Sequence, residues 1–476
     1  MPVRSRTLAA VLLALVLGAA PARAAGRPAV PDAVAAPADA TARPRNVILM
    51  IPDGCGPAAI TLARAAAGHP LVLDSLLVGA VETRSADSRV TDSAAAGTAY
   101  ATGVRTRNRM LGVDPDERPL GTLVEAATAR GLATGLVTTA DLTDATPAAF
   151  VAHVSQRALE DSIAVEMLAH HVDVLLGGDR SSWCPEGAGG RRRDGRDLLA
   201  EHRARGGTVV TTAAELAAAR SLPLLGVFGR GMDPIELEID RDTLLEPSLA
   251  QMTAKALELL GPAPRGFLVM IEGGHIDDAA HDDDPAGVAR EVLAYDRAVA
   301  LALAFARRDG RTLVVSVADH ETGGLGLGRR VGRASPYETF PESLATARAS
   351  VRRMSRDIVD GGDPVAVAER GTGSGPLDDE ERAALRAAAA APDSVRHFGL
   401  LRALSEIESR RAHVGWSTGG HTGVDVGLYA WGPGRWRFIG LHENTDVARL
   451  IAALLGLDLD AETRRLRDAA GAPARR

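Results

Sequence analysis

Thr312-Leu313-Val314-Val315-Ser316-Val317-Ala318-Asp319-His320 is the stretch of this chain that decides the fold. Its apolar run is continuous rather than alternating, which is typical of a strand buried on both faces of a parallel sheet. Two ionisable residues follow the run directly and indicate a functional site, although a surface turn would also account for them. Four other apolar runs lie beside acidic or histidine residues: 46–51 before Asp53, 133–138 before Asp144, 267–271 before Glu272, and 426–430 after His421.

Helical patterns lie between these runs, at 118–130, 156–171, 285–308 and 444–456. Strands that alternate with helices predict an α/β fold, which we expect to be a three-layer sandwich with a mostly parallel central sheet flanked by helices. In such sheets, sites form beyond the carboxyl ends of the strands. Most of the acidic and histidine clusters fall at those ends, and this agreement indicates a site more strongly than any single motif does.

The domain organisation follows from the two stretches that do not fit the strand-and-helix rhythm. Residues 179–235 mix Gly/Arg loops with a short helix, and residues 329–412 are polar, Arg-rich and partly helical. We expect both to be insertions, as loops or a cap, in one catalytic domain spanning 45–460. Residues 461–476 are predicted to be a tail that frays at its end.

The N-terminus has the order of a secretory signal. Arg4 and Arg6 precede an apolar stretch at 8–20, and Ala22-Arg23-Ala24 follows it, so residues 1–24 are predicted to be a signal peptide cleaved near Ala24. The alternative is a membrane anchor, but the apolar run is shorter than the roughly 20 residues that a spanning helix needs. We therefore expect a periplasmic or secreted protein with no membrane span in the mature chain. Residues 25–44, rich in Ala and Pro, are predicted to be a disordered lead-in.

Charge and cysteine content limit the partners. The formal net charge is −7, and the only lysine is Lys255. The basic run 191–193 is short and close to acidic residues, so we expect a solvated loop and no nucleic-acid-binding surface. Two cysteines allow one pairing in an oxidising compartment. We expect Cys55 to be a small buried residue and Cys184 to be free or loosely placed.

A candidate nucleophile lies in the segment Thr91-Asp92-Ser93-Ala94-Ala95-Ala96-Gly97, which reads as a short turn leading into a helix of very small residues. A serine in the first turn of such a helix has its hydroxyl beside unpaired backbone N–H groups and the positive end of the helix dipole. That position suits phosphate or another anion.

Candidate metal ligands recur along the chain, each with an ordinary alternative. Asp277 and His281 are four residues apart, so on a helix both could bind one metal, but the neighbouring acidic residues 282–284 would equally suit a solvated stretch. Asp53 and Glu272 precede glycines, as they would in simple turns. The remaining candidates could be a loop histidine (His421), a helix cap (Thr146) and a helix-surface arginine (Arg157). Each of these residues alone is weak evidence for a functional site, whereas the whole set together is not weak evidence.

In this order, the motifs resemble those of the alkaline phosphatases. The matching segments are Asp53-Gly54, Thr91-Asp92-Ser93-Ala94-Ala95, Asp144-Ala145-Thr146-Pro147-Ala148 with Arg157 beyond it, Glu272-Gly273, Asp277 with His281, Asp319-His320, and His421-Thr422-Gly423. The resemblance implies an exported phosphomonoesterase that acts on small-molecule phosphate monoesters, uses two Zn²⁺ and one Mg²⁺ per chain, and forms a homodimer.

The resemblance also implies a role for each matching residue. Ser93 would be the nucleophile that forms a phosphoserine, and Arg157 would grip two phosphate oxygens. The implied ligands are Asp277, His281 and His421 for one zinc; Asp53, Asp319 and His320 for the second; and Asp53, Thr146 and Glu272 for magnesium. Asp144 would lie in the outer shell of the magnesium ion. These roles agree with coordination chemistry, because His and Asp suit zinc and an all-oxygen set suits magnesium.

Asp278 departs from the family pattern, since many relatives carry a basic or aromatic residue near the phosphate at this point. A carboxylate there would repel the phosphate dianion or attract a cation that offsets it. We therefore expect Asp278→Lys to tighten inhibition by phosphate. Two other functions stay open: a phosphodiesterase of the same superfamily, and a non-catalytic protein that binds metal or phosphate at a surface. Ser93 and the third ligand set, Thr146 and Glu272, favour the monoesterase.

Overall fold

The computed structural model describes residues 43–229, 235–332 and 337–471 of the 476-residue chain. The predicted signal peptide, 1–24, and nearly all of the predicted lead-in, 25–44, lie outside the described residues. None of the helices within the described ranges is both long and apolar enough to cross a membrane.

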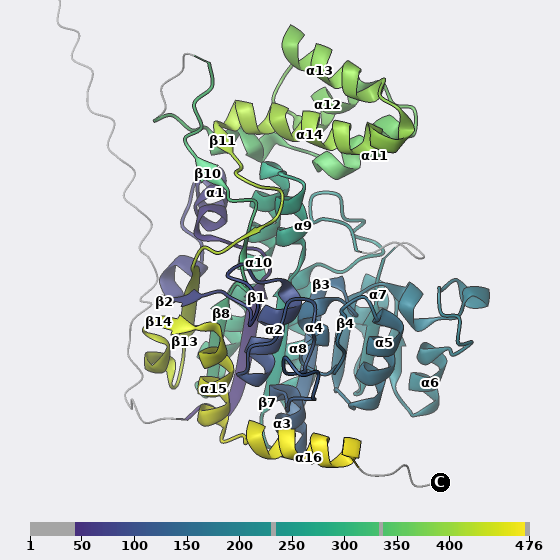
Figure 1. The fold of residues 1–476 in the computed structure, drawn as a ribbon, viewed down its shortest axis with the longest axis vertical. Coiled ribbons are helices and arrows are strands. Elements are labelled where there is room, and N and C mark those ends of the chain that lie inside the picture. The colour runs from purple at the N-terminus through teal and green to yellow at the C-terminus, as the bar shows by residue number, and fades with distance from the viewer. Residues whose placement is uncertain (1–42, 230–234, 333–336, 472–476) are drawn as a thin grey trace, which may run out of the picture.

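A ten-stranded sheet forms the centre of the molecule, in the order β14-β2-β13-β8-β1-β7-β3-β4-β6-β5 (Figure 1). Its strands are β1 (Asn46–Pro52), β2 (Leu77–Glu82), β3 (Ala133–Asp141), β4 (Val174–Gly178), β5 (Thr208–Val210), β6 (Leu224–Val227), β7 (Phe267–Gly273), β8 (Thr312–Val317), β13 (Val426–Trp431) and β14 (Gly440–Glu443). Within this sheet only β13 runs antiparallel to its neighbours, β2 and β8. The predicted mostly parallel sheet flanked by helices is therefore confirmed.

Helices cover both faces of the sheet, as is usual for sheets of mostly parallel strands. One face carries α1 (Pro57–Ala67), α8 (Leu249–Leu260) and α10 (Pro285–Asp309); the other carries α2 (Ser93–Thr102), α3 (Leu123–Ala129), α4 (Ala145–Ala148), α5 (Glu160–Ala169) and α15 (Asn444–Leu455). The central strands are buried on both faces: every residue of β1, β7 and β8 is buried. The strands β2 and β14 at one edge are mostly half-buried or exposed. Continuous apolar runs thus became central strands, as their pattern predicted.

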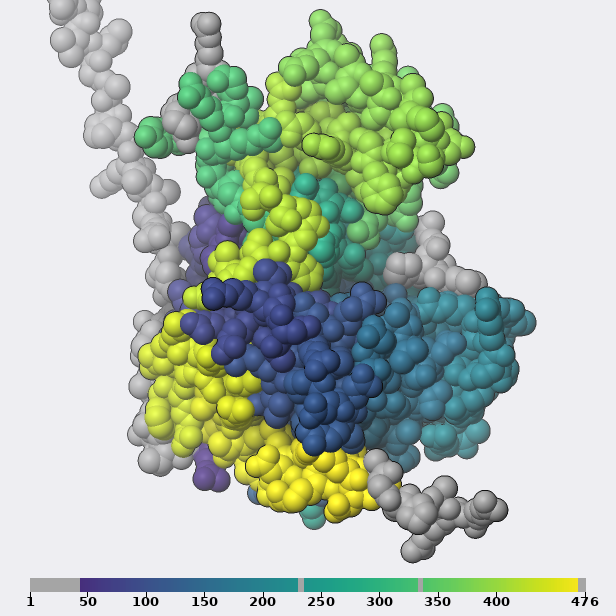
Figure 2. Space-filling view, viewed as in Figure 1, coloured from purple at the N-terminus to yellow at the C-terminus, as the bar shows by residue number. Residues whose placement is uncertain are grey.

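A helical cap stands at one end of the molecule as a mass of its own (Figures 1 and 2). It consists of α11 (Val351–Val359), α12 (Pro364–Thr372), α13 (Asp379–Ala389) and α14 (Asp393–Ala412). These helices enclose a separate small core that includes Met354, Leu385 and Leu404. The cap leaves and rejoins the body at β10 (Gly326–Leu327) and β11 (Val414–Gly415), which pair antiparallel.

Residues 179–235 differ from the expected insertion, because part of the range extends the central sheet. Strands β6 and β5 lie at the sheet edge beyond β4, and α6 (Leu198–Ala204) and α7 (Ala213–Ala218) accompany them. The expectation of a solvated loop at 191–193 is wrong for Arg192. That side chain is 1% exposed, pairs with Asp194, and donates to the carbonyl oxygens of Asp161 and Ser182 at 2.9 and 3.1 Å.

The C-terminal segment also departs from expectation. Helix α16 (Leu459–Gly471) continues through most of the predicted frayed tail and packs beside α3. Thr463 Oγ1 accepts a hydrogen bond from the backbone of Gly121 at 2.8 Å, which ties the helix to the body. Residues 472–476 lie outside the described part of the chain.

Both thiols are buried and free. The prediction for Cys55 is confirmed, and Cys184 is free but not loosely placed, since it is 2% exposed.

Candidate active site

The predicted site residues meet near the carboxyl ends of three neighbouring strands. Asp53 follows β1, Glu272 is the last residue but one of β7, and Asp319 and His320 follow β8. Parallel pairing aligns these ends, with Ile51 beside Glu272. The short hairpin of β9 (Glu321–Thr322) and β12 (His421–Thr422) then brings His421 to the same edge. Topology alone therefore gathers residues that are up to several hundred positions apart in the sequence.

Gly54 permits the turn that delivers Asp53. Its φ is +70°, and a Cβ there would lie 2.8 Å from the Cα of Asp277, closer than side chains tolerate. Its backbone N–H donates to Asp319 Oδ1 at 3.1 Å. The end of β1, the helix α9 (His275–His281) and the end of β8 are thus held in direct contact.

Ser93 is the first residue of α2 and is 3% exposed. Asp92 caps the helix by accepting from the backbone N–H of Ala95 at 2.9 Å. Ser93 Oγ lies 3.2 Å from His320 Nε2. All residues of α2 are buried, and a Cβ at Gly97 would lie 3.1 Å from Ala149 just after α4. Small side chains therefore let the helix approach α4 and hold the serine in the interior.

Asp277, His281 and His421 form the first group with metal-binding geometry. Asp277 Oδ2 is 3.2 Å from His281 Nε2. The Nε2 atoms of His281 and His421 are 3.1 Å apart. Each imidazole uses Nδ1 for a backbone carbonyl, that of Gly419 for His281 and that of Thr91 for His421, both at 2.9 Å. The two Nε2 atoms consequently face one another beside a carboxylate, an arrangement that suits a zinc site.

Asp53, Asp277 and His320 form the second group with metal-binding geometry, and Asp319 adjoins it through His320. His320 Nε2 is 3.2 Å from Asp319 Oδ2 and 3.6 Å from Asp53 Oδ1. Among the described residues, neither of those two oxygens finds a hydrogen-bond partner, although both are buried. Burial and the nearby Asp277 charge raise the pKa of Asp319 to about 8. A cation bound between buried carboxylates offsets both their mutual repulsion and the cost of burying their charge.

Thr146 and Glu272 form the third part of the site, on the other side of Asp53. Thr146 Oγ1 donates to Asp53 Oδ2 at 3.3 Å. Glu272 is buried at the end of β7 and accepts from Thr138 Oγ1 at 2.5 Å. Burial, together with the charge of Asp144, raises the pKa of Glu272 to about 7. The donors here are all oxygens, which suits magnesium.

Arg157 and Asp144 contact each other at the edge of the site. Arg157 Nη2 donates to Asp144 Oδ1 at 2.6 Å, and Nη1 lies 3.7 Å from Asp92 Oδ2. Although burial lowers it, the pKa of Arg157 is held above its usual range mainly by the charge of Asp144. Asp144 itself caps α4, a role that the sequence suggested for Thr146. Through its contact with Asp92, the guanidinium lies beside the residue that directly precedes Ser93.

Asp278, next to the proposed ligand Asp277 on α9, forms ion pairs with two basic side chains. Its carboxylate is 2.9 Å from His275 Nδ1 and 3.4 Å from Arg352 Nη2, which reaches across from the cap helix α11. Two cationic groups therefore already offset its charge. Burial opposes it, but the hydrogen bond from His275 keeps the pKa of Asp278 below its usual value.

Asp278→Lys is expected to lower stability by about 1–2 kcal/mol, because a third cation would meet His275 and Arg352. The half-exposed position keeps this cost below that of a buried pair. Thermal unfolding compares the variant with Asp278→Asn, which removes the charge without reversing it. Inhibition by phosphate, measured on both, tests the tighter binding that the sequence predicts. An unchanged melting temperature would contradict the pairing described here.

Three contributing residues were not singled out from the sequence. Thr322 Oγ1 donates to Asp277 Oδ1 and lies 3.2 Å from His320 Nδ1. Thr138 supports Glu272, and Asp92 accepts from the backbone of Arg109 at 2.9 Å beside Arg157. Only Asp92 carried a usable signal, as an N-cap type of residue directly before Ser93.

Comparisons with known proteins agree with one another. The chain matches the family model described as alkaline phosphatase over residues 44–457. It is 37% identical to the repressible alkaline phosphatase of Saccharomyces cerevisiae, over 90% of this chain and 84% of that protein. A cold-active alkaline phosphatase from Shewanella sp. superposes with a TM-score of 0.78 at 32% identity, covering 86% of this chain and 99% of that one. For Thermus thermophilus alkaline phosphatase the TM-score is 0.77 at 33% identity, with 90% and 96% covered.

Proposed function

Because the chain belongs to the alkaline phosphatase family, we propose that it is an exported enzyme that hydrolyses small phosphate monoesters to an alcohol and inorganic phosphate through a phosphoserine at Ser93. The observation that carries the proposal is the position of Ser93 Oγ, buried at the start of α2 and 3.2 Å from His320 Nε2. Around this one hydroxyl lie the two His/Asp groups and an arginine, which suit metal ions and a phosphate.

We propose that the site holds two zinc ions and one magnesium ion. Asp277, His281 and His421 would hold one zinc; Asp53, Asp319 and His320 the second; and Asp53, Thr146 and Glu272 the magnesium. The two unpartnered buried oxygens and the facing Nε2 atoms fit this assignment. When bound, the ions would supply positive charge to the nucleophile, the leaving oxygen and the attacking water.

Residues of the chain itself would carry out the nucleophilic attack and bind the phosphate oxygens. Ser93 Oγ attacks phosphorus as the ester oxygen leaves, and water then releases phosphate from Ser93, so that each turnover regenerates the hydroxyl. The N-terminus of α2 presents backbone N–H groups and its positive dipole end to the phosphate oxygens. Arg157 can turn its planar fork from Asp144 onto two of those oxygens.

Arg157→Ala is expected to lower kcat/KM by roughly 10–100-fold, chiefly through KM, and to weaken inhibition by phosphate. Arg157→Lys should recover only part of the loss, because an ammonium group cannot make two parallel hydrogen bonds. Steady-state kinetics with a chromogenic monoester measure both effects. Arg193→Ala, at a side chain 89% exposed, is the matched control. Equal kinetics in Arg157→Ala and the wild type would remove Arg157 from phosphate binding.

Phosphodiester hydrolysis is the second candidate, since related metal centres serve both reactions. Thr146 and Glu272, which converge on Asp53, favour the monoesterase because they provide a third ligand set. The two reactions separate when one preparation is assayed with a chromogenic monoester and the matching diester. A much higher kcat/KM for the monoester is expected, and a large preference for the diester would overturn the proposal.

A further inference from the structure

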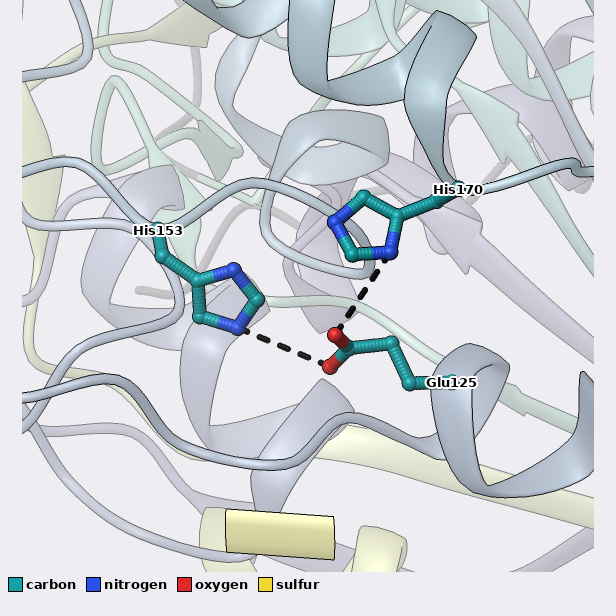
Figure 3. Close-up of side chains that lie close together, drawn as sticks. All are labelled: Glu125, His153 and His170. Carbon is teal, nitrogen blue, oxygen red and sulfur yellow. Dashed lines mark ion pairs between the residues drawn. The ribbon is translucent and has the colours of Figure 1, made fainter. Parts of the chain in front are cut away.

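Glu125, His153 and His170 form a second cluster of metal-ligand residues that shares no member with the site above (Figure 3). Glu125 belongs to α3, His153 lies in the segment after α4, and His170 is the C-cap of α5. In Figure 3 each imidazole ring points toward a different oxygen of the Glu125 carboxylate. Three elements that are separate in the chain thus present one donor each to a common point.

The spacing of the donors suits one small ion. His153 Nε2 is 3.5 Å from Glu125 Oε2, and His170 Nδ1 is 3.6 Å from Glu125 Oε1. An ion held tetrahedrally at 2.0–2.1 Å from each donor separates those donors by about 3.4 Å. One ligand atom from each residue can be chosen so that all lie within 4.8 Å of one another. Small side-chain rotations would therefore complete the coordination.

Glu125 is fixed in place and has spare acceptor capacity. Its side chain is only 2% exposed. Oε2 accepts from the backbone N–H and from Oγ1 of Thr122, both at 3.0 Å, in the capping box of α3. Oε1 is buried, and within the described part of the chain it has no hydrogen-bond partner. A buried carboxylate oxygen without a donor, aimed toward an imidazole, is unexpected in a purely structural capping box.

His153 has the outer partner that metal-bound histidines usually have. Its Nδ1 is 3.6 Å from Glu166 Oε2, and its backbone N–H donates to the same oxygen at 2.8 Å. Such a carboxylate orients the ring and increases the basicity of the opposite nitrogen. Nε2 also lies 3.0 Å from the carbonyl oxygen of Leu120, so a metal would replace a proton there. Despite burial, Glu125 and Glu166 raise the pKa of His153 to about 10.

We propose that Glu125, His153 and His170 bind a zinc ion that is additional to the catalytic metals. With two imidazoles and one carboxylate, the donor set leaves a fourth position for water. The ion would join α3 and the end of α5 to the segment that leads, four residues beyond His153, to Arg157. It would thereby stabilise the segment that carries Arg157, the residue proposed to bind two phosphate oxygens. The competing account is a metal-free cluster in which a protonated His153 pairs with both glutamates.

The test compares metal content and metal position. Wild-type protein, His170→Gln and the neighbouring control His171→Asn are equilibrated with zinc and magnesium, gel-filtered and analysed for both metals. His171 is exposed and has a φ of +52°, which asparagine accommodates. Loss of one zinc per chain in His170→Gln alone, with kcat for a monoester largely kept, is expected.

Anomalous diffraction from wild-type crystals grown with zinc locates the ion independently of whether His170→Gln folds. A zinc peak between the three side chains is expected, and peaks at the catalytic groups serve as the internal reference. Zinc uptake at the cluster should also strengthen as pH rises from 7 to 9, because a proton must leave His153. Catalytic peaks without a peak at Glu125 would overturn the proposal and favour the ion-pair cluster.

Discussion

Ser93→Ala is expected to abolish the phosphoenzyme and to lower kcat by roughly 10⁴-fold or more, while the metals stay bound. The substitution removes one hydroxyl that contacts His320 Nε2 and leaves every proposed ligand in place. Alanine also continues the run of small residues in α2, all of which are buried, so the helix should pack unchanged. Fold and metal content should therefore be preserved while the chemistry is lost.

Three measurements separate the nucleophile from a structural serine. Labelled phosphate retained on acid-quenched protein reports the phosphoserine, metal analysis reports the ligand groups, and steady-state rates report turnover. Ser88→Ala, at an exposed serine five residues upstream, is the matched control and should behave as the wild type. Near-full activity in Ser93→Ala, or loss of its metals, would show that Ser93 has another role.

Asp53→Asn is expected to lower kcat/KM by about 100-fold or more, because Asp53 is proposed to serve two metal positions at once. Oδ1 lies 3.6 Å from His320 Nε2, and Oδ2 accepts from Thr146 Oγ1 at 3.3 Å. An amide retains the shape of the side chain but supplies only one oxygen and no charge. Both zinc and magnesium should bind less tightly.

The same substitution should change stability in opposite directions with and without metal. Burial and the charges of Asp319 and Asp277 hold the pKa of Asp53 well above its usual value. In metal-free protein, Asp53→Asn removes a repelled carboxylate and should raise the melting temperature; in the metal-loaded protein it should lower it. Asp116→Asn, at an exposed carboxylate, is the control. A fall in melting temperature in both states would contradict a metal-balanced carboxylate cluster.

The central strands were predictable because burial on both faces leaves a continuous apolar run. The runs at 46–51, 267–271 and 312–317 all became core strands with ionisable residues at their carboxyl ends. The antiparallel direction of β13 could not be read in the same way, since a buried antiparallel strand shows the same apolar run as a parallel one. Strands β5 and β6 were missed because they are only three and four residues long.

The strand ends and the order of the motifs predicted that the site residues lie close together. They did not predict the residues that hydrogen-bond to those site residues and hold them in place. Thr322 and Thr138 are uncharged residues beside turns, and nothing in their sequence context distinguishes a support from an ordinary loop residue. Arg192 was misread because its burial depends on Asp161 and Ser182, which contact it only in the folded chain. Likewise Asp278 meets Arg352 only through the placement of the cap.

The most direct test of a metal-dependent phosphomonoesterase is hydrolysis of a chromogenic phosphate monoester at pH 8–10 by the purified protein, before and after chelation. Zinc and magnesium are then restored separately and together. Chelation is expected to abolish activity, and the two ions together are expected to restore it best. Absence of monoesterase activity in the fully metal-loaded protein, or activity that survives complete chelation, would contradict the proposed function.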